Sequence, residues 1–210
     1  MERTDAASLI DEALVRLGMP VPDSTVARRA RELVGEVAPP SLVNHSVRCY
    51  AWAVELARHD ELEFDPEILY VSAMLHDIGL VPAYDLGGSY EVDGAIAAER
   101  LVREAAEPEE RARAIYDAIA LHNDDAMPPD PAPETVLLWD ATGVDVTGER
   151  IEDVRPEIVA AVLAAYPRLE FKRDFGARFL DQATRKPTSK AAGMASAGLL
   201  EAIAQAPFES

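Results

Sequence analysis

The 210-residue chain is predicted to fold as a single all-α domain. Apolar residues recur at helical spacing along nearly its whole length, and the alternating runs rich in Val, Ile and Thr that indicate strands are missing. A chain of this length also suits one hydrophobic core. We therefore expect one helical bundle over residues 1–210, with a core region at about 41–185 and helical flanks at 1–40 and 186–210.

The first two helices are expected at about 5–17 and 24–36, where apolar residues follow helical spacing. Each expected helix is followed by residues that end helices. Gly18 and Pro20 come after the first, and Pro39 comes after the second. These signals predict two short N-terminal helices that precede the core region.

A longer third helix is expected over about 41–59, and a fourth is expected to begin where Asp65 precedes Pro66. Asp is a favoured N-cap because its side chain accepts backbone N–H groups, and Pro suits the first helical position because that N–H has no partner within the helix. Gly79 is expected to end this fourth helix. The pair His76-Asp77 is therefore predicted to lie near the helix C-terminus.

The second half of the chain continues the helical pattern between Pro-rich and Gly-rich breaks. Residues 80–90, with Pro82 and Gly87, are expected to form a loop beside the end of the fourth helix, and residues 127–133 a surface connection. Pro108 is expected to open a helix. The remaining helices are expected at about 92–105, 109–122, 134–142, 155–166, 169–184 and 193–205.

The pair His76-Asp77 is the most informative feature of the sequence. It lies in the apolar run Val71-Ser-Ala-Met-Leu-His-Asp-Ile-Gly79. Burying an imidazole and a carboxylate costs several kcal/mol unless the groups are paired or bind a metal. A divalent cation satisfies both ligand types at once. The pair therefore predicts a metal site.

Two further ionisable residues lie in apolar helical surroundings: His45, and Asp140 within Val136-Leu-Leu-Trp-Asp-Ala141. Taken alone, His45 also fits a hydrogen-bonded core histidine, and Asp140 also fits a helix cap or the partner of an Arg. Bundles commonly build metal sites from several helices. We expect His45, His76, Asp77 and Asp140 to hold one divalent ion. Mixed ligands of this kind suit Zn, Fe, Mn or Co, with Zn and Fe favoured.

The order of these residues resembles the HD superfamily of metal-dependent phosphohydrolases, whose pattern is H…HD…D on an all-α core. Other segments are similar to the cyanamide hydratase-like branch of that superfamily. The resemblance covers roughly residues 41–185. The segments that carry it are Asn44-His-Ser-Val-Arg-Cys-Tyr50, Leu75-His-Asp-Ile-Gly79, Tyr90-Glu-Val-Asp-Gly-Ala95, His122, and Ala165-Tyr-Pro-Arg168 with Phe171.

The resemblance also indicates how many metal ions to expect. In the two-metal subset of the superfamily, additional histidines follow the HD pair and bridge a second ion. Here only His122 is available, because His59 lies in a polar stretch and is expected to be exposed. The sequence therefore favours a single ion, and no role is expected for His59.

Proton transfer in hydrolysis needs a side chain close to the reacting water. Asp77, through its free oxygen, and His122 are the first candidates, and His122 is favoured as proton shuttle or substrate contact. The other interpretation of His122 is a residue that balances the dipole at a helix C-terminus. Its position beside a pocket is implied by the resemblance alone.

Arg48, Glu91 and Asp93 are further candidates for a role in catalysis, and Arg48 and Asp93 could instead have a purely structural role. Arg48 lies one turn after His45 and is expected either to bind a substrate anion or to anchor a carboxylate behind the ligands. Glu91 and Asp93 precede or begin a helix, so Asp93 is slightly favoured as its N-cap over a catalytic role. The resemblance implies that both acids lie close to the pocket.

The charge of the chain limits its partners. Twenty Lys and Arg residues against 38 Asp and Glu residues give a net charge of −18. Such a charge repels polyanions, so no nucleic-acid polymer is expected as a partner, although a small phosphate is not excluded. The expected partners are a small-molecule substrate and, through an apolar face of the last helix, a second copy of the chain in a homodimer.

The single cysteine, Cys49, permits no internal disulfide and is expected to be a small buried residue. No signal segment and no apolar run long enough to span a bilayer is recognised in the sequence. These features predict a cytoplasmic protein with no membrane partner.

Three functions follow from the sequence and the resemblance. The default is a hydrolase that uses metal-activated water on a small phosphate ester or nucleotide. The alternative is a hydratase that adds water to a carbon–nitrogen multiple bond, which the scarcity of basic residues near the ligands favours. A remote third is a non-catalytic domain that binds a ligand, and the presence of all four expected ligands argues against it.

Overall fold

The computed structural model describes residues 12–124 and 127–209. Within these ranges the chain forms α-helices and short 3-10 helices and no strand, which confirms the all-α prediction. Most of the first expected helix, 5–17, lies outside the described residues, and the part inside them is helical over 12–16. Within the described ranges, every helix is too short or too polar to cross a lipid bilayer.

The next three helices begin within one residue of the expected positions. Helix α2 spans Thr25–Val37. Helix α3 spans Pro40–His59, and helix α4 spans Pro66–Leu75. The Asp65 side chain accepts the backbone N–H groups of Glu67 and Ile68, so it is the N-cap of α4 as expected.

Helix α4 ends earlier than the sequence predicts. His76 is its C-cap, Asp77 lies in the turn that follows, and a 3-10 helix, η1, spans Ile78–Leu80. Gly79 therefore does not end the helix. A Cβ at this position would lie 2.0 Å from the carbonyl oxygen of Tyr90, so glycine is required because two backbones approach closely here.

Three helices follow the loop around the 3-10 helix η2, Pro82–Tyr84. They are α5, Tyr90–Glu104; α6, Glu109–Leu121; and α7, Pro133–Thr147. Helix α7 continues for more than one turn beyond the expected end at residue 142. It ends at Gly148, which has a φ of 87°, a left-handed value that favours glycine.

The last part of the chain forms α8, Pro156–Ala165, and α9, Phe171–Arg185. The single helix expected at 193–205 is instead two helices, α10, Lys190–Ser196, and α11, Leu199–Gln205. Gly198, with a φ of 97°, breaks the helical path between them. A periodic apolar pattern continues across such a break, so the pattern alone does not predict it.

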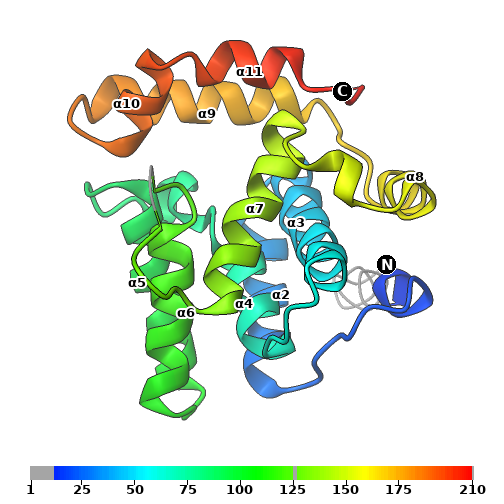
Figure 1. Cartoon of the computed structure of the whole chain (residues 1–210). Helices are drawn as coiled ribbons and strands as arrows, with labels where there is room; N and C mark the ends of the chain where they lie inside the picture. Colours follow the sequence, from blue (N-terminus) through cyan, green and yellow to red (C-terminus); the bar gives the residue numbers. More distant parts are fainter. Residues whose placement is uncertain (1–11, 125–126, 210) are drawn as a thin grey trace.

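The helices form a bundle with a second layer across one end. Helices α3 and α7 pack side by side, as do α5 and α6, and α4 contacts all four. Helices α9, α10 and α11 lie across the end of this bundle where α4 stops (Figure 1). The largest fully buried side chain, Trp52 on α3, lies in the main core.

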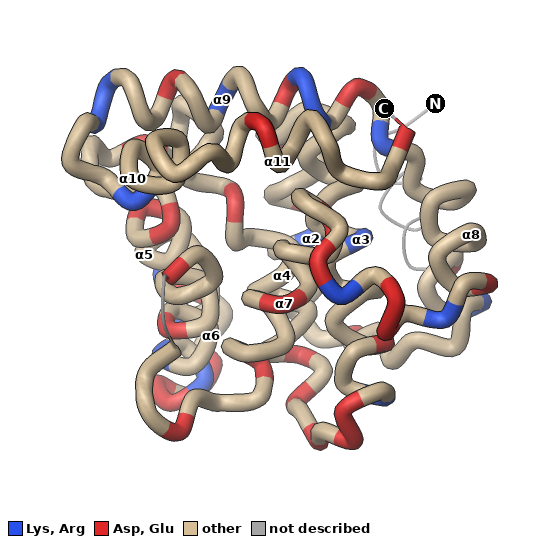
Figure 2. Tube along the Cα trace, turned by 45° about the horizontal axis from the view of Figure 1, so that its top comes forward, with Lys and Arg blue, Asp and Glu red and all other residues tan. Residues whose placement is uncertain are grey.

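Helix α9 separates a charged outer face from an aromatic inner face. Along the helix, basic and acidic residues alternate on the outside (Figure 2). Phe171, Phe175 and Phe179 are buried on the inside with ring centroids 5.0 and 6.0 Å apart between successive residues. These rings form the roof over the bundle end that carries His76 and Asp77.

An ion-pair network holds the loop before α5 against the end of α9. Lys186 lies 2.8 Å from one Asp85 carboxylate oxygen, and Arg185 lies 2.8 Å from the other. The Asp93 carboxylate accepts the backbone N–H of Leu86, also in this loop. Because Asp93 lies inside α5, it is not the helix N-cap; it fastens the loop to the helix.

This network predicts a pH dependence of stability. The hydrogen bond from Lys186 and the neighbouring Arg185 hold the pKa of Asp85 well below its usual range. The carboxylate therefore stabilises the fold above the ordinary pKa of about 4, and this stabilisation is lost as the pH falls below it. In melting curves from pH 6 to pH 3, we expect the Tm of wild type to fall more steeply than that of Asp85→Asn; parallel profiles would contradict this role.

Candidate metal centre

His45, His76 and Asp77 come together where α3, the end of α4 and the roof of α9 meet. The three residues are 1%, 0% and 2% exposed, respectively. Phe171 stacks on the ring of His45 at 4.5 Å between centroids. The sequence therefore buries two imidazoles and a carboxylate under an aromatic roof, as the apolar surroundings of the HD pair predicted.

The three side chains present their ligand atoms as a compact triangle. The Nε2 atoms of His45 and His76 lie 3.1 Å apart. The Asp77 Oδ2 atom lies 3.2 Å from the first and 3.3 Å from the second. Ligands bonded to one transition-metal ion at about 2.0–2.2 Å lie roughly 3.0–3.4 Å from one another. The spacing of the three atoms thus fits a common ion.

Hydrogen bonds on the far side of each ring fix which nitrogen faces the triangle. His76 Nδ1 donates to the carbonyl of Ala73 at 2.9 Å, and His45 Nδ1 donates to Asp145 Oδ2 at 2.7 Å. With the proton on Nδ1, each ring directs the lone pair of Nε2 to the centre. This is the tautomer that metal-binding histidines adopt.

Asp77 provides a direct test of whether a cation fits. Both of its carboxylate oxygens are buried without a hydrogen-bond partner among the described residues. Although burial favours the neutral acid, the neighbouring histidines His76, His122 and His45 hold the pKa of Asp77 well below its usual range. Burial lowers the pKa of His76, which favours the neutral ring. For His45 the direction is opposite: although burial favours the neutral ring, Cys49, Asp145 and Asp77 raise its pKa well above the usual range. A buried anionic carboxylate beside two imidazole nitrogens suits a divalent ion, which would take the place of the protons on these nitrogens.

Asp145, on the last turn of α7, is the carboxylate behind His45. It is completely buried, and Arg48 holds it with two hydrogen bonds of 2.7 Å, one to each oxygen. Trp52 donates a further bond of 2.9 Å. Although burial favours the neutral acid, Arg48 and His45 hold the pKa of Asp145 well below its usual range. Arg48 therefore anchors a carboxylate and is not free to bind a substrate anion.

Asp140 does not join this cluster, contrary to the expectation from sequence. Its carboxylate pairs with Arg150 at 2.6 Å, and Arg150 also pairs with Asp60. Asp140 and Asp145 are five residues apart on α7, so they point to different sides of the helix. The structure thus brings Asp145, not Asp140, beside His45.

His122, the C-cap of α6, completes the polar lining of the centre. Its Nε2 lies 3.7 Å from Asp77 Oδ1, and its Nδ1 donates to the carbonyl of Ile119 at 2.6 Å. The ligand atoms of His76, Asp77 and His122 all lie within 4.8 Å of one another. Asn123 contacts His122 Nε2 at 3.0 Å and also bonds the Tyr90 hydroxyl.

Two other residues singled out in the sequence lie in the buried interior. Glu91 is fully buried, and neither of its carboxylate oxygens has a hydrogen-bond partner among the described residues. Its catalytic role stays a prediction. Cys49 is buried as expected, with its sulfur 3.7 Å from His45 Nε2.

A cavity of about 230 Å³ opens beside the cluster at His122. Phe175 and Phe179 of α9 form one wall, and Trp139 and Thr142 of α7 form another. The described residues that line it include Asp124 and Glu149 but no Lys or Arg. The cavity therefore meets the polar cluster at His122, and its lining among the described residues carries no cation.

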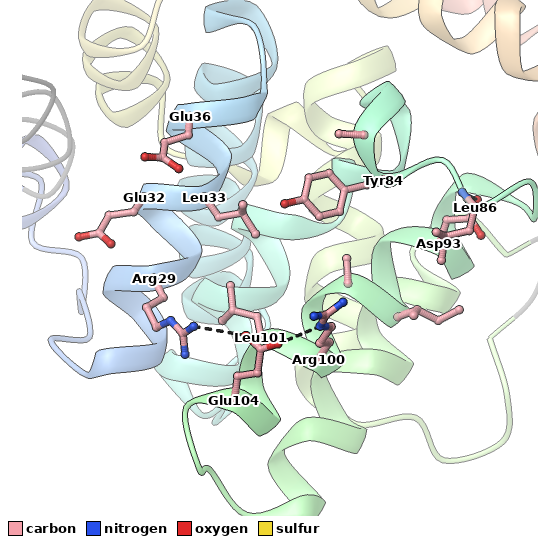
Figure 3. Close-up of a pocket in the computed structure, with 13 residues that line it drawn as sticks. Arg29, Glu32, Leu33, Glu36, Tyr84, Leu86, Asp93, Arg100, Leu101 and Glu104 are labelled. Carbon is pink, nitrogen blue, oxygen red and sulfur yellow. Dashed lines mark hydrogen bonds and ion pairs between the residues drawn. The ribbon is translucent and has the colours of Figure 1, made fainter.

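A larger cavity of about 550 Å³ lies elsewhere, between α2 and α5. Figure 3 shows the carboxylate of Glu104 between Arg29 and Arg100, which pair with it at 3.4 and 2.8 Å. None of the residues of the polar cluster line this cavity. Its two lining arginines pair with Glu104, and the groove is separate from the ligand cluster.

The fold and the buried His and Asp residues define an HD domain. Residues 42–161, more than half of the chain, match the HD domain family, so the chain belongs to it. The matched segment includes His45, the pair His76-Asp77 and both candidate acids of α7.

Two proteins of Saccharomyces cerevisiae are similar to the chain over most of its length. They are cyanamide hydratase DDI2 and cyanamide hydratase DDI3, and each is 27% identical over 187 residues, which cover 87% of this chain and 83% of the relative. This similarity supports the assignment to the cyanamide hydratase-like branch. The chain is therefore an enzyme of the metal-dependent HD hydrolase and hydratase type.

Proposed function

We propose that the chain adds water to a small, uncharged molecule with a carbon–nitrogen multiple bond, of which cyanamide is the type. The observation that carries this proposal is the small cavity at His122, which has aromatic walls and, among the described residues, no lining Lys or Arg. Lys190, beside the lining residue Asp124, is already paired with that carboxylate and donates to the carbonyl of Ala120. A phosphate ester in this cavity would therefore lack a free cationic partner among the described side chains that line it. The similarity to two cyanamide hydratases supports the same substrate class.

In this proposal, His45, His76 and Asp77 hold one divalent ion, with Zn or Fe favoured for ligands of this mixture. When bound, such an ion supplies water that ionises near neutral pH and polarises the atom of the substrate that it contacts. Asp145 holds the ring of His45 in the orientation that ligation requires, through the bond to Nδ1.

Hydration requires a proton to move between two atoms of the substrate. The water oxygen bonds to the nitrile carbon, and both water protons finish on the former nitrile nitrogen, which converts cyanamide to urea. We assign this proton transfer to His122, because its Nδ1 donates to Ile119, its Nε2 lies 3.7 Å from Asp77 Oδ1, and the residue lines the cavity. Asn123, which contacts the same Nε2, orients the ring.

The aromatic roof supplies one apolar wall of the cavity. Phe175 and Phe179 are 4% and 0% exposed, and both line the cavity. A linear substrate of a few atoms fits this space, and the walls offer it apolar contacts.

Hydrolysis of a small phosphate ester or nucleotide, the default expectation from sequence, is the second candidate, since the HD superfamily contains such enzymes. Such a hydrolase needs a cationic side chain that binds the phosphate group of its substrate. Arg48, the basic residue nearest to His45 in the sequence, is committed to Asp145. We therefore rank carbon–nitrogen hydration above phosphate ester hydrolysis for this chain.

The test is a side-by-side assay of metal-loaded protein for urea formed from cyanamide and for phosphate released from a panel of nucleotides. We expect urea formation and no phosphate release above the level of His76→Ala protein. Phosphate release that is lost in His76→Ala, without urea formation, would overturn the hydratase proposal in favour of the esterase.

The same assay tests whether His122 transfers a proton during the reaction. We expect His122→Gln to retain its metal and to lower kcat for urea formation by about 10²–10⁴, the usual contribution of a proton-transfer group. Metal content is measured in parallel. Unchanged kcat would remove His122 from the mechanism, and loss of the metal would make it a ligand.

A further inference from the structure

We propose that Phe208, in the segment after α11, is a positioning residue for the metal centre and acts on His45 through Arg168 and Asp145. The proposal rests on the metal centre described above but does not depend on which substrate is hydrated. Phe208 is distant in sequence from all the candidate ligands, and neither the family match nor the expected motif includes it.

Arg168 lies over the faces of two aromatic rings. The carbon of its guanidinium group is 4.6 Å from the ring centroid of Phe208 and 4.9 Å from that of Phe171. We call these three residues the Arg168 sandwich. Phe208 is 8% exposed and Arg168 is 4% exposed, so the guanidinium group is almost completely removed from water.

The two aromatic rings compensate part of the cost of burying the Arg168 cation, which has few hydrogen-bond partners. Nε and one terminal nitrogen of Arg168 are buried without a hydrogen-bond partner among the described residues. A buried charge with unmet donors costs several kcal/mol. Aromatic rings in contact with a guanidinium group recover part of this cost through cation–π attraction. Loss of the Phe208 ring would remove one of the two cation–π contacts of Arg168, and we expect the side chain to turn toward water.

The remaining nitrogen of Arg168 connects the sandwich to the metal centre. It donates to the backbone carbonyl of Asp145 at 3.0 Å and lies 3.4 Å from the carboxylate of the same residue. Asp145 in turn accepts the Nδ1 proton of His45 at 2.7 Å. Arg168 thus fixes the main chain and side chain of the residue that orients a ligand.

A second route runs through the other ring of the sandwich. Phe171 contacts Arg168 and also stacks on the imidazole of His45, at 4.5 Å between ring centroids. Phe208, Arg168, Phe171 and His45 therefore form a chain of successive contacts that ends at a ligand. Movement of Arg168 disturbs His45 through both Asp145 and Phe171.

The experiment measures metal affinity by chelator competition, with Zn²⁺ as the probe, alongside Tm without metal. The variants are Phe208→Ala, Phe208→Leu and Phe208→Trp. Leu keeps apolar bulk without a π face, whereas Trp restores the face. The matched control is Ile203→Ala, since Ile203 is 2% exposed on α11 and belongs to the apolar cluster that contains Phe171.

We expect Phe208→Ala and Phe208→Leu to weaken Zn²⁺ binding by about 10-fold, the lower end of the effect of removing a group that contacts a ligand directly, because Phe208 acts through Arg168. Phe208→Trp should bind as wild type does, and Ile203→Ala should lower Tm without changing the affinity. Wild-type affinity in Phe208→Leu, or equal weakening in Ile203→Ala, would overturn the proposal. Because the readout is binding, a failure to form urea leaves this result intact.

Discussion

Replacing His76 by Ala should abolish metal retention and reduce turnover by about 10³-fold or more. The substitution removes one of the three atoms of the ligand triangle, and a metal contributes several kcal/mol to charge stabilisation. Asp77→Asn should have a similar effect on affinity, because it keeps the shape of the side chain but removes the negative charge. Elemental analysis and the urea assay measure both consequences.

His59→Ala is the matched control for this prediction. His59 is half-exposed at the end of α3 and lies 3.6 Å from Asp153, away from the ligand triangle. We expect wild-type metal content and turnover from this variant. A His76→Ala protein that is fully loaded and active would contradict the assignment of His76 as a ligand.

Asp145→Asn should lower the free energy of unfolding by about 3–5 kcal/mol, a larger loss of stability than any other substitution at the metal centre. The change leaves the buried Arg48 without its anionic partner and weakens the bond to His45 Nδ1. For a chain of this size, the loss corresponds to a fall in Tm of roughly 10 °C. Metal affinity should fall with it.

Asp140→Asn is the comparison that separates the two acids of α7. Asp140 pairs with the partly exposed Arg150, and pairs of this kind contribute about 0–1 kcal/mol. Its substitution should therefore change Tm by only a few degrees and leave metal affinity unaltered. Melting curves and Zn²⁺ titrations of the two variants check the prediction; a larger effect at Asp140 would reverse their roles.

These two acids show how far the sequence predicts the site. Both lie among apolar neighbours, Asp140 after Trp139 and Asp145 between Val144 and Val146. The expected ligand set omits Asp145 because the expected helix stops at residue 142. Helix α7 instead runs to Thr147, since Gly148 supplies the left-handed turn that ends it. If Gly148 is taken as the residue that ends this helix, the sequence places both acids on it, and both are then candidate metal ligands.

The helices are largely predictable because strong local signals mark their ends. Ser24 and Asp65 accept backbone N–H groups at the starts of α2 and α4. Local sequence signals do not predict the role of a residue that is required by a contact with a distant part of the chain. Gly79 is required by close contact with the Tyr90 carbonyl and not by a helix end, and this is known only once α5 is in place.

The roles of individual side chains depend on partners distant in sequence. Arg48 suits either a substrate anion or a carboxylate, and its bonds to Asp145 decide between them. Asp93 suits a helix cap by its position in the sequence, but it holds Leu86 in the preceding loop. Arg168 and Phe171 belong to a segment that carries the family resemblance, but their contact with Phe208 has no signal in the sequence, because Phe208 lies in the segment after α11.

The most direct test of the metal centre is a crystal structure of metal-loaded protein with anomalous scattering measured at the absorption edge of the added ion. We predict one peak within about 2.0–2.2 Å of His45 Nε2, His76 Nε2 and Asp77 Oδ2. A peak bonded to Asp140, or the absence of a peak from the ligand triangle in protein that contains one ion per chain, would contradict this account.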